Sequence, residues 1–229
     1  MEQRGESLHF EKGDAYRAAG QEAQAEGDAE QAREHFLAAV DQYSKALELR
    51  RSGAPDPAQE ALLLNSTALT YADLGNQESM RRFLNEVEEA RDSVQDEGYR
   101  ALLLLSIGLL HMNLSEFDAA RDAYEEALHI YEDTDVLPEL ALTHHGIGLS
   151  HSLAGEWEDA LPHFERAMEI AESLRRPASA ATDLELVLDA QYADYYRDAV
   201  QAYVTLGRVE EAFDTSERAR ARSFLDQVG

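Results

Sequence analysis

The chain contains no cysteine. Without cysteine it has no disulfide, no thiolate ligand for a metal and no cysteine nucleophile of its own. Long apolar runs are missing too, since the longest, residues 101–110, falls short of the roughly 18 residues that a membrane span needs. The first residues are polar and lack the apolar core of a secretory signal. These absences lead us to expect a cytoplasmic protein.

Lysine is also scarce. Lys12 and Lys45 are the only lysines among 20 basic residues, and 46 acidic residues bring the formal net charge to −26. Such a field repels phosphate backbones and anionic lipid surfaces, so we expect neither nucleic acid nor a membrane as partner. Two explanations of the charge stay open, a basic partner or adaptation to molar salt. The even spread of acid and the loss of lysine but not arginine favour halophilic adaptation.

Proline is rare, with five residues, and the chain has no long alternating runs of β-branched residues. This composition predicts an all-α protein. Two segments 40 residues apart match position by position, which predicts stacked helical hairpins. The matched pairs are Leu104 with His144, Ile107 with Ile147, Gly108 with Gly148, His111 with His151, Ala120 with Ala160, Tyr124 with Phe164, and Ala127 with Ala167.

The pattern resembles the tetratricopeptide repeat (TPR), in which W-x2-L-G-x2-Y on a first helix precedes A-x3-F on a second. Looser copies run through Gly13, Tyr16, Ala32 and Phe36, through Leu64, Thr67, Ala68, Tyr71, Met80 and Leu84, and through Tyr196, Ala199, Val200, Tyr203, Ala212 and Ser216. The resemblance implies a right-handed α-solenoid of about five hairpins in one domain, residues 1–229. We expect the hairpins at about 6–52, 57–95, 99–133, 138–175 and 178–228.

The last hairpin carries a more specific signal. Residues 206–212 and 216–225 resemble the TPR region that precedes the caspase-like CHAT domain in bacterial proteins. In that family the peptidase domain uses a His/Cys dyad, and no catalytic residue carries over to a chain without cysteine. The resemblance implies that this chain is the N-terminal part of a longer protein and the regulatory arm of a CHAT-type peptidase.

The TPR resemblance also implies a protein-binding groove lined by the first helix of each hairpin. By position, the groove residues are Asn65, Leu69, Leu105, Leu109, Met112, Asn113, His145, Leu149, Leu153 and Arg197. A largely apolar strip predicts a helical or extended peptide as ligand, from another protein or a linked domain. Whether neighbouring helices already cover the leucines stays open, and so does self-association of two copies.

Three histidines support an alternative of another class. His111, His144 and His151 lie among carboxylates, as in metal-dependent enzymes or sensors that bind zinc or nickel. A simpler explanation is that His111 and His151 replace the packing tyrosine of the repeat, each with one hydrogen bond. No H-E-x-x-H, phosphate-loop or G-x-S-x-G motif occurs. We therefore expect a non-catalytic scaffold without cofactor or metal, and keep the metal site and a homo-oligomerisation module as alternatives.

Overall fold

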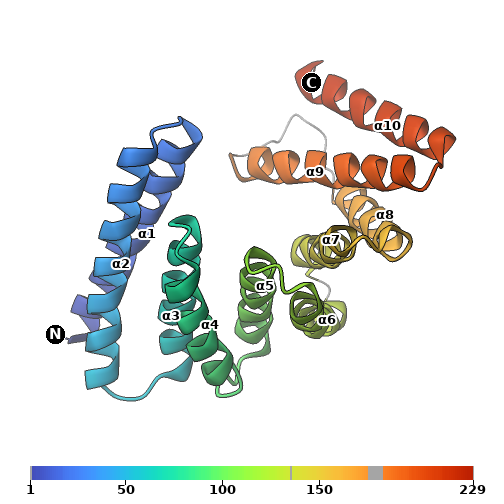
Figure 1. Cartoon of the computed structure of the whole chain (residues 1–229). Helices are drawn as coiled ribbons and strands as arrows, with labels where there is room; N and C mark the ends of the chain where they lie inside the picture. Colours follow the sequence, from blue (N-terminus) through green and yellow to red (C-terminus); the bar gives the residue numbers. More distant parts are fainter. Residues whose placement is uncertain (1, 135, 175–182, 229) are drawn as a thin grey trace. The chain divides into compact units, whose positions relative to one another are not determined.

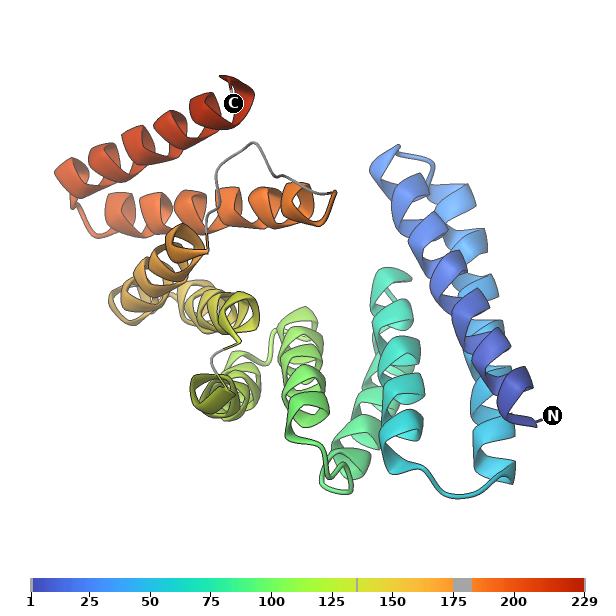
Figure 2. The same cartoon turned by 180° about the vertical axis from the view of Figure 1, so that it is seen from behind.

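The computed structural model describes residues 2–134, 136–174 and 183–228, which form ten helices and no strand (Figures 1 and 2). The predicted all-α class is therefore confirmed. The expected hairpin ends at residues 175 and 178, and the side chains of residues 221–228, lie outside the described part. The helices are α1 (Glu2–Ala25), α2 (Ala29–Ser52), α3 (Pro57–Asp73), α4 (Gln77–Arg91), α5 (Glu97–Asn113), α6 (Phe117–Thr134), α7 (Leu137–Ala154), α8 (Trp157–Ser173), α9 (Asp183–Thr205) and α10 (Val209–Val228).

The helices gather into two compact units, unit 1 (residues 1–116) and unit 2 (residues 117–229). In unit 1, α1 packs on α2, α3 packs on α4, and α5 packs on both α3 and α4. In unit 2, each helix from α6 to α9 packs on the next. Each unit is therefore built mainly from contacts between helices that are close in sequence. Among the described helices, none combines the length and apolarity that a bilayer crossing needs.

Short polar side chains fix where several helices begin. Asp28, Asp56, Asn76 and Asp96 each accept a hydrogen bond from the backbone N–H three residues ahead, at 2.9–3.1 Å. Each bond satisfies one of the donors that the first helical turn leaves free. The starts of these four helices are thus determined by local sequence.

The turn between the two helices of a hairpin recurs with the 40-residue period. Gly75 and Gly155 take left-handed backbone angles, with φ of +67° and +86°. Ser115 stands midway between them and has φ of 59°. A residue with a β carbon is strained in this region, whereas glycine is not. The third repeat therefore keeps the turn geometry without the residue that suits it best.

The two helices of a hairpin approach closely where the repeat pattern places its glycine. A β carbon on Gly148 would lie 2.6 Å from the ring of Phe164, which is fully buried in α8. This contact pairs α7 with α8 at the position that the sequence pattern assigns to a small residue. The glycine is needed for space and not for backbone freedom.

Candidate functional site

The fifth position of the repeat is buried in three successive hairpins. Asn65, Leu105 and His145 stand 40 residues apart and are 7%, 8% and 9% exposed. Asn65, on α3, donates from Nδ2 to Ser106 Oγ on α5 at 3.2 Å. These three predicted groove residues are thus largely covered by protein rather than open to a ligand.

The ninth and thirteenth positions are more open. Leu69 is half-buried, and Leu109 is 49% exposed. Met112 is half-buried and Asn113 is exposed, with its Nδ2 atom donating to the Leu109 carbonyl at 2.9 Å. Of the predicted groove residues in unit 1, Leu109 offers the largest apolar surface.

One face of α5 therefore carries exposed apolar side chains. Tyr99, Leu102 and Leu109 are 55%, 48% and 49% exposed, and their spacing places them on one side of the helix. The other leucines of this helix, Leu103, Leu104, Leu105 and Leu110, are buried. We call Tyr99, Leu102 and Leu109 the α5 stripe.

A second face of this kind lies on α7 in unit 2. Leu142 and Leu153 are 38% and 60% exposed, and Leu149 between them is half-buried. The three stand seven and four residues apart, so they follow one side of the helix. We call them the α7 stripe. Leu149 and Leu153 are predicted groove residues, and Leu142 lies on the same face.

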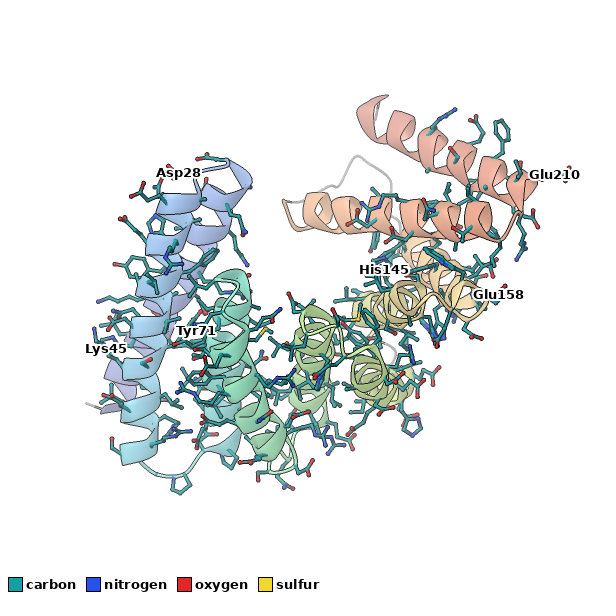
Figure 3. The ribbon with its side chains drawn as sticks, in the orientation of Figure 1. Asp28, Lys45, Tyr71, His145, Glu158 and Glu210 are labelled. Carbon is teal, nitrogen blue, oxygen red and sulfur yellow. The ribbon has the colours of Figure 1, made fainter. Side chains whose placement is uncertain are left out.

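The polar groove residues of unit 2 join α7 to α9. His145 lies between these helices (Figure 3). It donates from Nε2 to Asp198 Oδ2 at 2.8 Å. Arg197 is two-thirds exposed and bonds Asp194 at 2.5 Å and Asp198 at 3.0 Å. Burial alone would raise the pKa of Asp198, but the hydrogen bonds from His145 and Arg197 outweigh burial and lower it.

His111 joins α4 to the turn that follows α5 in unit 1. Its Nδ1 atom bonds Glu116 at 2.9 Å and its Nε2 atom bonds Glu88 of α4 at 3.1 Å. Glu116 also accepts a bond from Arg81 of α4 at 2.7 Å. The bond from Arg81, followed by that from His111, lowers the pKa of Glu116. We call this Arg–Glu–His arrangement a staple.

The same staple recurs 40 residues later in unit 2. His151 Nδ1 bonds Glu156 Oε2 at 2.8 Å, and Arg121 of α6 lies 3.2 Å from the same carboxylate. Chiefly through the bond from His151, the pKa of Glu156 is lowered. Glu156 precedes α8 but makes no side-chain capping bond, because its carboxylate faces the histidine. Both histidines thus have the hydrogen bond that the packing interpretation required.

Two further histidines meet beside the second staple. His144 Nδ1 lies 3.2 Å from His163 Nδ1, and the His163 ring stacks at 6.0 Å on that of His151. Burial, with added repulsion from His163 and Arg166, lowers the pKa of His144 to about 4. Burial also lowers the pKa of His163, with His151 adding to the effect and Asp159 opposing it. Burial thus disfavours the charged form of both rings.

A carboxylate completes this group. Ligand-type atoms of His151, Glu156 and Asp159 all lie within 4.8 Å of one another, and no other such trio occurs among the described residues. The sequence pattern indicated His144 and His151, but not His163, Asp159 or the arginines of both staples. Comparison of charged residues at the 40-residue offset would have found Arg81 with Arg121.

Part of the chain matches a known repeat family. Residues 99–173 match the family model for the tetratricopeptide repeat. No curated protein matches the chain. Among solved structures, BtubC (BKLC) from P. vanneervenii superposes with a TM-score of 0.73 at 17% identity, covering 98% of this chain and 92% of that one.

Two other solved structures share the fold. TPR-like repeats of a putative kinesin light chain from Podosopora anserina give a TM-score of 0.71 at 14% identity, covering 94% of this chain and 96% of theirs. A Rap protein complexed with Competence and Sporulation Factor gives 0.65 at 14% identity, covering 93% of this chain and 54% of its own. The fold is thus a TPR-like helical solenoid, a class generally used to bind proteins.

Proposed function

We propose that the chain is a protein-binding scaffold that holds a helical or extended peptide on the exposed α5 stripe of unit 1. The observation that carries this proposal is the exposure of Leu102 and Leu109 on a helix whose other leucines are buried. A helix that is apolar all round usually has protein on all sides. Exposed leucines grouped on one face mark an interaction site.

The stripe and the charge together describe the partner. Leu102 and Leu109 stand two helical turns apart, about 10 Å, and this spacing suits a peptide with apolar anchors at every third or fourth residue. The chain carries a net charge of −26, so basic residues flanking those anchors would speed the encounter. The ligand we propose is an amphipathic segment with arginine or lysine at its edges.

The comparisons support this proposal at the level of fold. A Rap protein of similar fold is known in complex with Competence and Sporulation Factor. Residues that pack the repeat carry no chemistry of their own, so we propose a non-catalytic role. We propose that the chain plays this role in the cytoplasm.

The partner segment belongs either to another protein or to a linked domain. The resemblance of residues 206–225 to the region before CHAT domains supports a linked peptidase-type domain that the repeats regulate. Blotting the source cell with an antibody to this segment tests the linkage. A product well above 25.6 kDa supports it, and a product of 25.6 kDa leaves an adaptor that acts on a separate partner.

A photo-crosslinking amino acid at position 109 tests the scaffold itself. The matched control is position 37, because Leu37 of α2 is 48% exposed and stands outside both stripes. In the source cell we expect one dominant crosslinked partner from position 109 and none from position 37. The purified partner should then lose most of its affinity for Leu109→Ser and keep it for Leu37→Ser.

Three outcomes would contradict the proposal. Equal crosslinking at both positions would mean nonspecific exposure, and no crosslink would mean no ligand. A crosslink within the same chain would mean that the α5 stripe is covered by the chain itself. Light scattering across protein concentrations separates a foreign partner from a second copy, since self-association raises the apparent mass with concentration.

A further inference from the structure

The second staple has neighbours that the first staple lacks. Asp159 and the His163 ring lie beside His151, and His144 contacts His163 in turn. At the 40-residue offset, the corresponding residues beside His111 are Leu104, Ala123 and Ala119. The first staple forms its contacts without these groups. Packing therefore does not account for three extra ligand-type side chains at one point of unit 2.

The distances suit a single metal ion. Zinc stands about 2.0–2.2 Å from imidazole nitrogen and carboxylate oxygen, so two ligand atoms on one ion are at most about 4.4 Å apart. The ligand-type atoms of His151, Glu156 and Asp159 lie within 4.8 Å of one another, and small side-chain rotations close the difference. The bond from His151 Nδ1 to Glu156 already measures 2.8 Å.

A second imidazole packs beside the trio. The His163 ring lies 6.0 Å from the His151 ring, centroid to centroid. Its Nδ1 atom lies 3.2 Å from His144 Nδ1, so His163 is held in place beside His151. We take His163 as a residue that positions His151 and not as a ligand.

We propose that unit 2 carries a binding site for a divalent transition-metal ion, best suited to zinc, with His151, Glu156 and Asp159 as ligands and water in the fourth position. An imidazole with two carboxylates suits zinc, cobalt or nickel, whereas magnesium and calcium prefer oxygen alone. This site is independent of the peptide-binding function proposed above.

One cation competes for the site. Arg121 lies 3.2 Å from Glu156 and must give up this contact when the ion binds. Arg121 also bonds Asp118, so it keeps a partner after the exchange. Because of this competition, we expect the affinity for zinc to be weaker than that of a structural zinc site.

Calorimetric titration of the chelator-treated full chain with zinc chloride tests the proposal. We expect one ion per chain, at least tenfold weaker binding after Asp159→Asn, and no comparable heat with magnesium. The matched control is Glu158→Gln, which removes the same charge from the same first turn of α8 but lies outside the trio. It should bind zinc like the wild type.

Two more variants separate the metal site from the staple. His111→Ala breaks the first staple and should leave zinc binding intact, whereas His151→Ala should abolish it. Cobalt absorption gives a further measurement, because an intense visible band indicates four-coordination and should be lost after Asp159→Asn and kept after Glu158→Gln. Wild-type affinity in Asp159→Asn, or equal loss in Glu158→Gln, would overturn the proposal and indicate general attraction of cations to an acidic surface.

Discussion

Replacement of Gly148 by alanine sets two physical effects against each other. Alanine in the middle of a helix is favoured over glycine by about 1 kcal/mol. Its β carbon, however, would stand 2.6 and 2.7 Å from two ring carbons of Phe164, where ordinary contacts are 3.4–4 Å. The ring is fully buried and would have to move by about 0.8 Å within a close-packed core. Such overpacking costs about 1–3 kcal/mol.

We take the upper part of that range, because the clash involves a rigid ring and not a flexible chain end. Gly148→Ala is then expected to lower the free energy of unfolding by about 2 kcal/mol after the helix gain is subtracted. Urea unfolding followed by the fluorescence of Trp157, the single tryptophan, reports on unit 2. A smaller side chain at position 164 should relieve the clash, so Phe164→Leu should cost less in the Gly148→Ala variant than in the wild type.

The control for this experiment is Gly5→Ala in α1. A β carbon at that position would meet Leu49 at 3.4 Å, an ordinary contact. We expect its free energy of unfolding, measured by circular dichroism, to equal or slightly exceed that of the wild type. If Gly148→Ala instead stabilises unit 2 by about 1 kcal/mol, helix propensity dominates and the close approach of α7 and α8 is not a constraint.

The turns and the charges give three further predictions. Ser115→Gly should raise the free energy of unfolding in urea by about 0.5–1 kcal/mol, because glycine takes left-handed backbone angles without strain. A destabilised variant would show that Ser115 is not strained. The pKa of Asp198 is lower in the folded chain than in the unfolded chain. Its ionised carboxylate therefore stabilises the fold above the unfolded pKa of about 3.9, and this stabilisation is lost as the pH falls through the folded pKa. Asp198→Asn should therefore lower the melting temperature at pH 7 more than at pH 3, and an equal loss at both would rule out this linkage. The melting temperature of the wild type should rise steeply from low to molar salt, where screening acts within about 3 Å, and a flat profile would count against halophilic adaptation.

The fold was predictable because the repeat pattern is made of packing residues. Gly148 and Phe164 appear in the pattern and meet in the structure as a small residue against a large one. The hydrogen bonds of His111 and His151 were foreseen as well, since a histidine in a packed position needs a partner.

The candidate sites were only partly predictable. Helical periodicity gives the direction of Asn65 and His145, but not how far a neighbouring helix covers them, and both are buried in contacts. The meeting of His144 with His163 joins two helices, so no spacing along one helix could reveal it. Asp159 lies on α8 and His151 on α7, so spacing along one helix could not reveal their proximity either.

The two staples have a consequence for how the gene can change length. Arg81 and Glu116 stand 35 residues apart, and so do Arg121 and Glu156. Removal of residues 101–140 would place Arg81 35 residues before the present Glu156. His151 would keep its place five residues before that glutamate. Unequal recombination between neighbouring repeats can therefore delete or duplicate a hairpin in one step while each junction keeps its ion-paired contact.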